Sequence, residues 1–263
     1  YRQNSVAAPI KETLAAVMVS LSFWKAGRVL VDPCCGSGTI PIEAAMMGRN
    51  MAPGIGRRFA AEDWEAIAPS LWKEERKRAF EAVDWDSPLK IYAYDIDKKA
   101  IEAAMENAAE AGVADDIRFC RADSAKLCLS GQLTDMNKSG DKDREGGIII
   151  TNPPYGERIS TNDLLGLYQM IGERLKHAFV GNEAWVLSYR EECFDQIGLK
   201  ASQKVPLFNG PLECEFRKYE IFDGKYKEFK SQEEGEEKKE AEGEQAPRFR
   251  ERKEFKPRRE GEF

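Results

Sequence analysis

The sequence predicts an α/β fold: a doubly wound, mostly parallel seven-stranded sheet with an antiparallel hairpin at one edge. Short apolar, β-branched runs alternate with amphipathic helical stretches along most of the chain. Several of these runs end in a carboxylate or an amide, as at Asp32, Asp95 and Asn152. Two final extended segments have no full helix between them, which is typical of a hairpin.

Each element has its own signal in the sequence. The chain opens with a helix predicted from Ile10 to about Phe23, begun by Pro9 because proline suits a first helical turn. A later helix is expected between Asp97, a good N-cap, and Gly112, a good terminator. The other predicted helices cover about 39–47, 163–179 and 191–197, and the predicted strands cover 28–32, 89–94, 117–121, 148–152, 184–189, 200–206 and 213–222.

Residues 49–88 interrupt this alternation and are predicted to be an insertion between the first sheet helix and the second strand. A charged helical stretch is expected from about Glu62 to Val83, with Trp64, Trp72 and Phe80 at roughly helical spacing. We expect these aromatic side chains to pack within the protein.

Composition narrows the possible functions. The 263 residues carry a net charge of -6, so any nucleic-acid-binding surface must be local. Six cysteines without a C-x-x-C pair and a single histidine, His177, predict no metal site. Free thiols fit a cytoplasmic protein, and the longest apolar stretch, Leu14 to Trp24, is too short to cross a membrane. The chain begins at Tyr1 rather than Met, so we expect an upstream region.

The first predicted strand leads into a glycine-rich turn, Asp32-Pro33-Cys34-Cys35-Gly36-Ser37-Gly38-Thr39. A phosphate-binding loop needs a lysine after its glycines, and this turn has none. A dinucleotide fingerprint needs a third glycine, where this chain has Pro41. S-adenosylmethionine carries no phosphate; it needs a carboxylate for its amino group and small residues beside its aminoacyl end. The turn therefore favours S-adenosylmethionine as the cofactor.

Two further acids fit the same ligand, because the carboxyl ends of parallel strands meet at one edge of a sheet. Asp95 ends the second strand, where it can take both ribose hydroxyls, and Asp123 follows the third strand within reach of an adenine amino group. The predicted cofactor contacts are Asp32, Cys34, Gly36, Gly38, Thr39, Asp95, Ile96, Asp123, Ser124 and Asn152.

The stretch Thr151-Asn152-Pro153-Pro154-Tyr155-Gly156 follows the apolar run of the fourth strand. Its two prolines fix the backbone and lack N–H groups. The side-chain oxygen of Asn152 and the carbonyl of Pro153 can accept hydrogen bonds from an exocyclic amine, and Tyr155 can stack on a base turned out of its strand. The predicted catalytic residues are therefore Asn152, Pro153 and Tyr155, acting on an amino nitrogen of a nucleobase.

Other chemistries fit less well. Methylation at cytosine C5 requires a cysteine nucleophile, commonly beside the proline of this motif, and here that position is Pro154. Cys34 and Cys35 are expected to be packing thiols, and His177 is expected to be a surface or helix-end residue rather than a catalyst. Arg158 fits a phosphate contact or a salt bridge equally well.

Together these residues resemble the class I methyltransferases, in the amino-methylating branch with an Asp/Asn-Pro-Pro-aromatic motif. The closer resemblance is to the bacterial RNA guanine-N2 methyltransferases of the ribosomal large-subunit type, which usually carry an N-terminal THUMP domain. It covers residues 1 to about 222 and is carried by four stretches: Tyr1-Arg2 with Ala8–Ala16, Asp32–Thr39, Thr151–Arg158 and Phe208–Cys214.

This resemblance implies a Rossmann-like catalytic domain over residues 1–224, with the insertion at about 49–88. It also implies transfer of a methyl group to guanine N2 in RNA, with 23S ribosomal RNA favoured as the partner. A monomer is expected, and the THUMP region would be missing from this chain.

Three alternatives stay open. The substrate could be transfer RNA, or the reaction could be adenine-N6 methylation of DNA or RNA, because those enzymes share the Pro-Pro motif. From a different class, the chain could be a cofactor- or RNA-binding module that does not catalyse, which an intact Asn152-Pro153-Pro154-Tyr155 disfavours.

The last segment, residues 225–263, is predicted to be a disordered tail. Residues 231–244 contain seven Glu and two Lys, and residues 245–259 contain five Arg and two Lys against two Glu. So few apolar residues cannot bury enough surface to order the segment. Its basic half is either a solubilising tail or an arm that contacts RNA phosphates.

Overall fold

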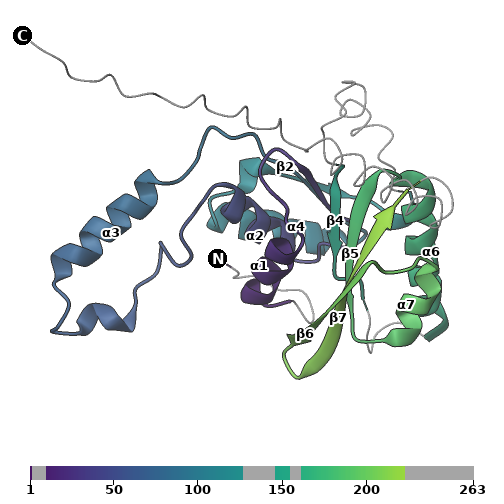
Figure 1. Ribbon diagram of the computed structural model, residues 1–263. Helices are drawn as coiled ribbons and strands as arrows, with labels where there is room; N and C mark the ends of the chain where they lie inside the picture. Colours follow the sequence, from purple (N-terminus) through teal and green to yellow (C-terminus); the bar gives the residue numbers. More distant parts are fainter. Residues whose placement is uncertain (2–9, 127–145, 155–160, 223–263) are drawn as a thin grey trace, which may run out of the picture. The chain divides into compact units, whose positions relative to one another are not determined.

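A seven-stranded sheet in the order β3-β2-β1-β4-β5-β7-β6 organises the protein (Figure 1). The computed structural model describes residue 1 and residues 10–126, 146–154 and 161–222. The strands are β1 (Val29–Asp32), β2 (Lys90–Asp95), β3 (Ile117–Arg121), β4 (Ile148–Thr151), β5 (Asn182–Ser188), β6 (Gln203–Asn209) and β7 (Leu212–Ile221). All neighbouring strands are parallel except β5–β7 and β6–β7, which are antiparallel. The predicted fold class and edge hairpin are confirmed.

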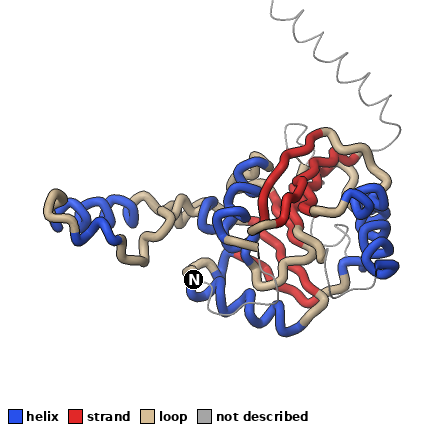
Figure 2. The backbone as a smooth tube through the Cα atoms, turned by 90° about the horizontal axis from the view of Figure 1, so that it is seen from below, coloured by secondary structure: helices blue, strands red, loops and turns tan. Residues whose placement is uncertain are grey.

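Helices cover both faces of the sheet, as the tube view shows (Figure 2). One buried apolar cluster joins the sheet to α1, α2 and α4, and a second joins it to α6 and α7. The helices are α1 (Glu12–Leu21), α2 (Thr39–Gly48), α3 (Pro69–Glu81), α4 (Lys98–Glu110), α6 (Thr161–Ala178) and α7 (Glu191–Ile197), with short 3-10 turns η1 (Ala60–Asp63), η2 (Ala114–Asp116) and η3 (Ser124–Lys126). The longest of these helices is too polar to cross a membrane, and no other described helix qualifies.

The central strands read as unbroken apolar runs because both of their faces are buried. In β4, Ile148 and Ile150 belong to the first cluster and Ile149 to the second. Strand side chains alternate between faces, so a single run of three isoleucines contributes to both cores.

Helix ends follow the predicted signals closely. The side chain of Asp97 accepts a hydrogen bond from the Lys99 backbone N–H at 2.9 Å and caps α4. Gly112 follows that helix with φ +73°, a conformation that glycine adopts without strain. The first helix is shorter than predicted: α1 begins at Glu12 rather than Ile10, and Phe23, with φ +55°, lies beyond its end.

The helix predicted from Glu62 to Val83 is wrong in its first part. The chain forms η1 and then a separate helix, α3, that begins at Pro69. Proline cannot continue a helix interior, and it keeps the preceding Ala68 extended, with φ -60° and ψ 132°. Figure 1 shows α3 away from the sheet, and none of its residues is buried.

The insertion has its own small packing centre. The ring of Trp72 stacks on Phe59 with centroids 5.8 Å apart, and Arg76 donates to the Ile55 carbonyl and to Glu62 Oε1, each at 2.6 Å. The expected packing role is therefore confirmed for Trp72. It is wrong for Trp64 and Phe80, which are 62% and 63% exposed.

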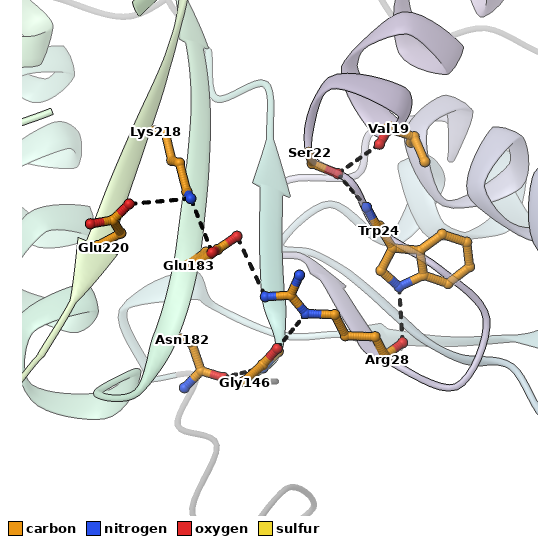
Figure 3. Close-up of polar contacts among 10 residues, drawn as sticks. Val19, Ser22, Trp24, Arg28, Gly146, Asn182, Glu183, Lys218 and Glu220 are labelled. Atoms are coloured by element: carbon orange, nitrogen blue, oxygen red, sulfur yellow. Dashed lines mark hydrogen bonds and ion pairs between the residues drawn. The ribbon is translucent and has the colours of Figure 1, made fainter. Parts of the chain in front are cut away.

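At the amino edge of the sheet, an ion-pair network ties four strands together (Figure 3). Arg28, just before β1, donates to the Gly146 carbonyl before β4 and pairs with Glu183 of β5 at 3.4 Å. Lys218 of β7 also pairs with Glu183, at 3.0 Å. These contacts satisfy the polar groups at this edge, so it has a structural role.

We predict that Gly172→Ala destabilises the protein strongly, because an added Cβ would lie 2.0 Å from the carbonyl oxygen of Ile197 and force α6 away from α7. Overpacking of this kind costs about 1–3 kcal/mol. Gly166 of the same helix faces open space, so Gly166→Ala should stabilise by about 0.5–1 kcal/mol through helix propensity. Urea unfolding of both variants measures the difference, and equal effects would contradict the α6–α7 packing.

Candidate active site

The residues singled out from the sequence meet at the carboxyl edge of the parallel strands. Asp32, the last residue of β1, pairs with Ala93 of β2, and its neighbour Val31 pairs with Ile149 of β4. The strand ends that carry Asp95 and Asn152 therefore flank the end of β1. This arrangement brings the two acids and the amide to one edge of the sheet.

Backbone contacts hold the glycine-rich turn over this edge. Gly36 donates its N–H to Asp95 Oδ2 at 2.9 Å, and Cys35 donates to the Tyr94 carbonyl at 2.8 Å. From α4, the amide of Asn107 donates to the Ser37 carbonyl at 3.0 Å. Sequence reasoning missed Asn107, although an amide inside an Ala-rich helical stretch is a usable signal.

Gly38 has a packing reason to be glycine. Its φ is +83°, and an added Cβ would lie 2.9 Å from the Cβ of Ala104 in α4. The turn at Gly36, with φ +54°, is likewise left-handed. Thr39 then begins α2 as a buried residue.

Asp32 is the most perturbed group at this edge. It is 1% exposed, and its Oδ1 accepts a hydrogen bond from the Cys34 backbone N–H at 3.1 Å. Its Oδ2 makes no hydrogen bond within the described part of the chain. Burial raises the pKa of Asp32 from 3.8 to about 8, against the lowering effect of the hydrogen bonds from the Cys34 N–H and the Thr151 hydroxyl. A buried carboxyl with one unsatisfied oxygen is suited to a cationic ligand group.

Asn152 Oδ1, just after β4, is also buried and has no hydrogen-bond partner among the described residues. The Thr151 hydroxyl, at the end of β4, interacts with the Asp32 carboxyl. Buried polar atoms are nearly always hydrogen-bonded in native proteins, so orphaned acceptors here point to a missing ligand. Thr151 was not among the predicted site residues; the polar residue that ends an otherwise apolar strand was its only signal.

Asp95 ends β2 and Asp123 follows β3, at the same edge of the sheet. Asp95 Oδ1 accepts from the Asp97 N–H at 2.9 Å, which leaves a second lone pair on each of its oxygens. Ile96 beside it is 62% exposed, and Asp123 caps η3 by accepting from the Ala125 N–H at 3.0 Å. Ser124 begins that turn.

The cysteines of the turn are inert. Burial, together with the nearby carboxylates of Asp32 and Asp95, raises the pKa of both Cys34 and Cys35 above its ordinary value. They remain thiols at neutral pH, which matches the expected packing role. His177 lies in α6, is 74% exposed and pairs with Glu173 of the same helix.

Some predicted features lie outside the described residues. These are Tyr155, Arg158, Pro9 and the 225–263 tail. Within the described ranges, no three His, Cys, Asp or Glu side chains gather as a metal site.

Replacing Asp32 should change how stability depends on pH. Between about pH 4 and 8 the folded protein holds a proton on Asp32 that the unfolded chain has lost, so stability falls as pH rises through this range. Asp32→Asn removes the carboxyl that takes up this proton. At pH 8 and without ligand, the free energy of unfolding of the variant should exceed that of the parent by more than about 1 kcal/mol, and this difference should shrink towards pH 4. Urea unfolding at pH 4.5, 6 and 8 measures it; a gap independent of pH would contradict the buried carboxyl.

Curated relatives match most of this chain. It is 40% identical over 223 residues to "Putative RNA methyltransferase YpsC" of Bacillus subtilis, a match that covers 83% of this chain and 54% of YpsC. It is 38% identical over 231 residues to ribosomal RNA large subunit methyltransferase K/L of Vibrio parahaemolyticus, covering 84% of this chain and 30% of that protein. The chain thus spans about half the length of the first relative and about a third of the second.

Solved structures share the fold. SMU.472 in complex with SAH (S-adenosylhomocysteine) superposes with a TM-score of 0.73 at 33% identity, over 85% of this chain and 56% of that one. A protein from Listeria monocytogenes, described as a predicted N6-adenine-specific DNA methylase, has a TM-score of 0.71 at 36% identity, over 84% and 54% of the two chains.

A family model also matches nearly the whole described region, residues 1–218. The sheet order, the turn after β1 and the amide at the end of β4 all lie inside the matched region. On this match and the similarity to YpsC, the chain belongs to the RMKL-like methyltransferase domain family.

Proposed function

We propose that this chain transfers a methyl group from S-adenosylmethionine to an exocyclic amine of RNA, the N2 amine of a guanine in 23S ribosomal RNA being favoured. One observation carries the proposal: Asp32 Oδ2 and Asn152 Oδ1 lie buried at one edge of the sheet, and neither makes a hydrogen bond within the described part of the chain. Family membership and the RNA methyltransferase names of the relatives support it.

The edge fits S-adenosylmethionine, whose sulfonium supplies an activated methyl group. Asp32 Oδ2 is proposed to accept a hydrogen bond from the amino group of the aminoacyl end, and an ionised Asp32 would balance the charge of that group. Asp95 has lone pairs left for the ribose hydroxyls, with exposed Ile96 as an apolar contact for the base. Asp123 and Ser124, on the next strand end, are proposed to face the adenine amino group. The SAH bound to the similar SMU.472 supports this assignment.

Asn152 would act on the amine that is methylated. An exocyclic amine is a poor nucleophile because its lone pair is delocalised into the ring. Asn152 Oδ1 lacks a partner among the described residues, so it and the Pro153 carbonyl can hold the two N–H groups and direct the lone pair at the methyl carbon. Most of the rate would come from this positioning, with Tyr155 proposed to stack on the base.

The choice of guanine N2 rests on the chain's resemblance to the ribosomal large-subunit enzymes at its start and near Asn209, and on the K/L names of relatives. Adenine N6 is the second candidate, because the Listeria structure of 36% identity is described as an adenine methylase. The two reactions yield different methylated nucleosides, N2-methylguanosine and N6-methyladenosine. Transfer RNA is an alternative substrate.

Labelled methyl transfer tests the proposal. With labelled S-adenosylmethionine, the chain should label in vitro-transcribed 23S ribosomal RNA, and nucleoside mass spectrometry should find N2-methylguanosine. Asn152→Ala should lower the rate by about 10²–10³, as the loss of one positioned transition-state contact does, with nearly normal cofactor affinity.

Calorimetry separates the possible failures. No binding of S-adenosylmethionine would sink the cofactor assignment. Binding without transfer would favour a non-catalytic module, and N6-methyladenosine as the product would favour the second candidate. A near-normal rate in Asn152→Ala would refute the role of that amide.

A further inference from the structure

A tyrosine–arginine pair follows β5, the neighbour of β4, which Asn152 follows. Thr151 of β4 pairs with Val186 of β5, and Tyr189 directly follows Ser188, the last residue of β5. Neighbouring strands lie about 4.8 Å apart and rise about 3.3 Å per residue, which puts the backbones of Tyr189 and Asn152 roughly 8 Å from each other. The pair therefore lies at the edge of the candidate active site.

The two side chains hold each other in place. Arg190 Nε donates to the Tyr189 hydroxyl at 3.1 Å, and the guanidinium carbon lies 5.6 Å from the centre of the ring. The Arg190 backbone N–H donates to Ser188 Oγ at 3.2 Å and fixes the turn into α7. An exposed ring and a guanidinium thus sit together in a preset orientation.

The pair lies outside the apolar cores of the fold. Tyr189 is 36% exposed and belongs to neither buried apolar cluster. Among the described residues, Arg190 has one further ion pair, with Glu192 at 3.7 Å, and such a half-exposed contact contributes little to stability. The guanidinium has five N–H donors, so most remain for a ligand.

A second stacked pair shows the contrast. Arg118 of β3 lies 5.7 Å from the ring centre of Tyr92, a similar geometry, but Tyr92 is 9% exposed and belongs to the core of the sheet. Tyr189, by contrast, is 36% exposed at the active-site edge and has the Arg190 guanidinium beside its ring.

We propose that Tyr189 and Arg190 hold the RNA nucleotide next to the target, the ring stacking on its base and the guanidinium donating to its phosphate. The inference rests on the proposed function, and single-stranded RNA suits it because unpaired bases stack on aromatic side chains. Arginine matches phosphate geometry with two parallel N–H donors.

Kinetics with in vitro-transcribed 23S ribosomal RNA test the pair. Tyr189→Leu should raise the KM for RNA about tenfold, with kcat and the KM for S-adenosylmethionine within about twofold, because one stacking contact contributes about 1–3 kcal/mol. Tyr189→Phe keeps the ring and should restore most of the affinity. Arg190→Gln should raise the KM for RNA and lower the salt dependence of binding by about one phosphate contact.

Arg118→Gln is the matched control and should leave the KM for RNA unchanged. The inference is overturned if Tyr189→Leu and Arg190→Gln have the same KM for RNA as the control. It is also overturned if the salt dependence of RNA binding is unchanged in Arg190→Gln. Fluorescence anisotropy with labelled RNA repeats the comparison without methyl transfer. If the two variants lose RNA binding while the parent binds RNA but shows no turnover, the result counts against the proposed function. The same result supports the role of Tyr189 and Arg190 in holding RNA.

Discussion

The parallel alignment of β1, β2 and β4 is the constraint on which the rest of the structure depends. Because these strands run in the same direction, Asp32, Asp95 and Asn152 reach one edge without any special loop. The opposite edge is closed by Arg28, Glu183 and their partners. The charged groups at that opposite edge pair with one another, whereas Asp32 Oδ2 and Asn152 Oδ1 make no hydrogen bond among the described residues. The edge that carries these two oxygens is the one suited to a ligand.

A buried carboxyl at the centre of that edge has an energetic cost. Burial raises the pKa of Asp32 to about 8, so the protein at neutral pH holds a mostly protonated carboxyl. A cationic ligand group reverses this preference, since it stabilises the ionised form. The residue that costs stability without ligand is therefore the one that gains most from binding, an exchange common at functional sites.

Much of this could be predicted from the sequence, where local chemistry decides the outcome. Isoleucine runs, the Asp97 cap and Gly112 act locally, and the sheet elements follow them to within a few residues. Prediction failed in the insertion, where the periodicity of Trp64 and Phe80 outweighed Pro69 although proline fixes the helix start. It also missed Asn107 and Thr151, because their roles depend on which elements pack together, and a sequence pattern does not state that.

Proton release on cofactor binding tests the central claim most directly. Calorimetric titration of S-adenosylmethionine at pH 6.5, in buffers of different ionisation enthalpy, counts the protons exchanged. If Asp32 ionises to hold the amino group, the parent chain should release close to one proton per cofactor, and Asp32→Asn should release none and bind more weakly. Tight binding with no proton released, or equal release by the variant, would contradict the account.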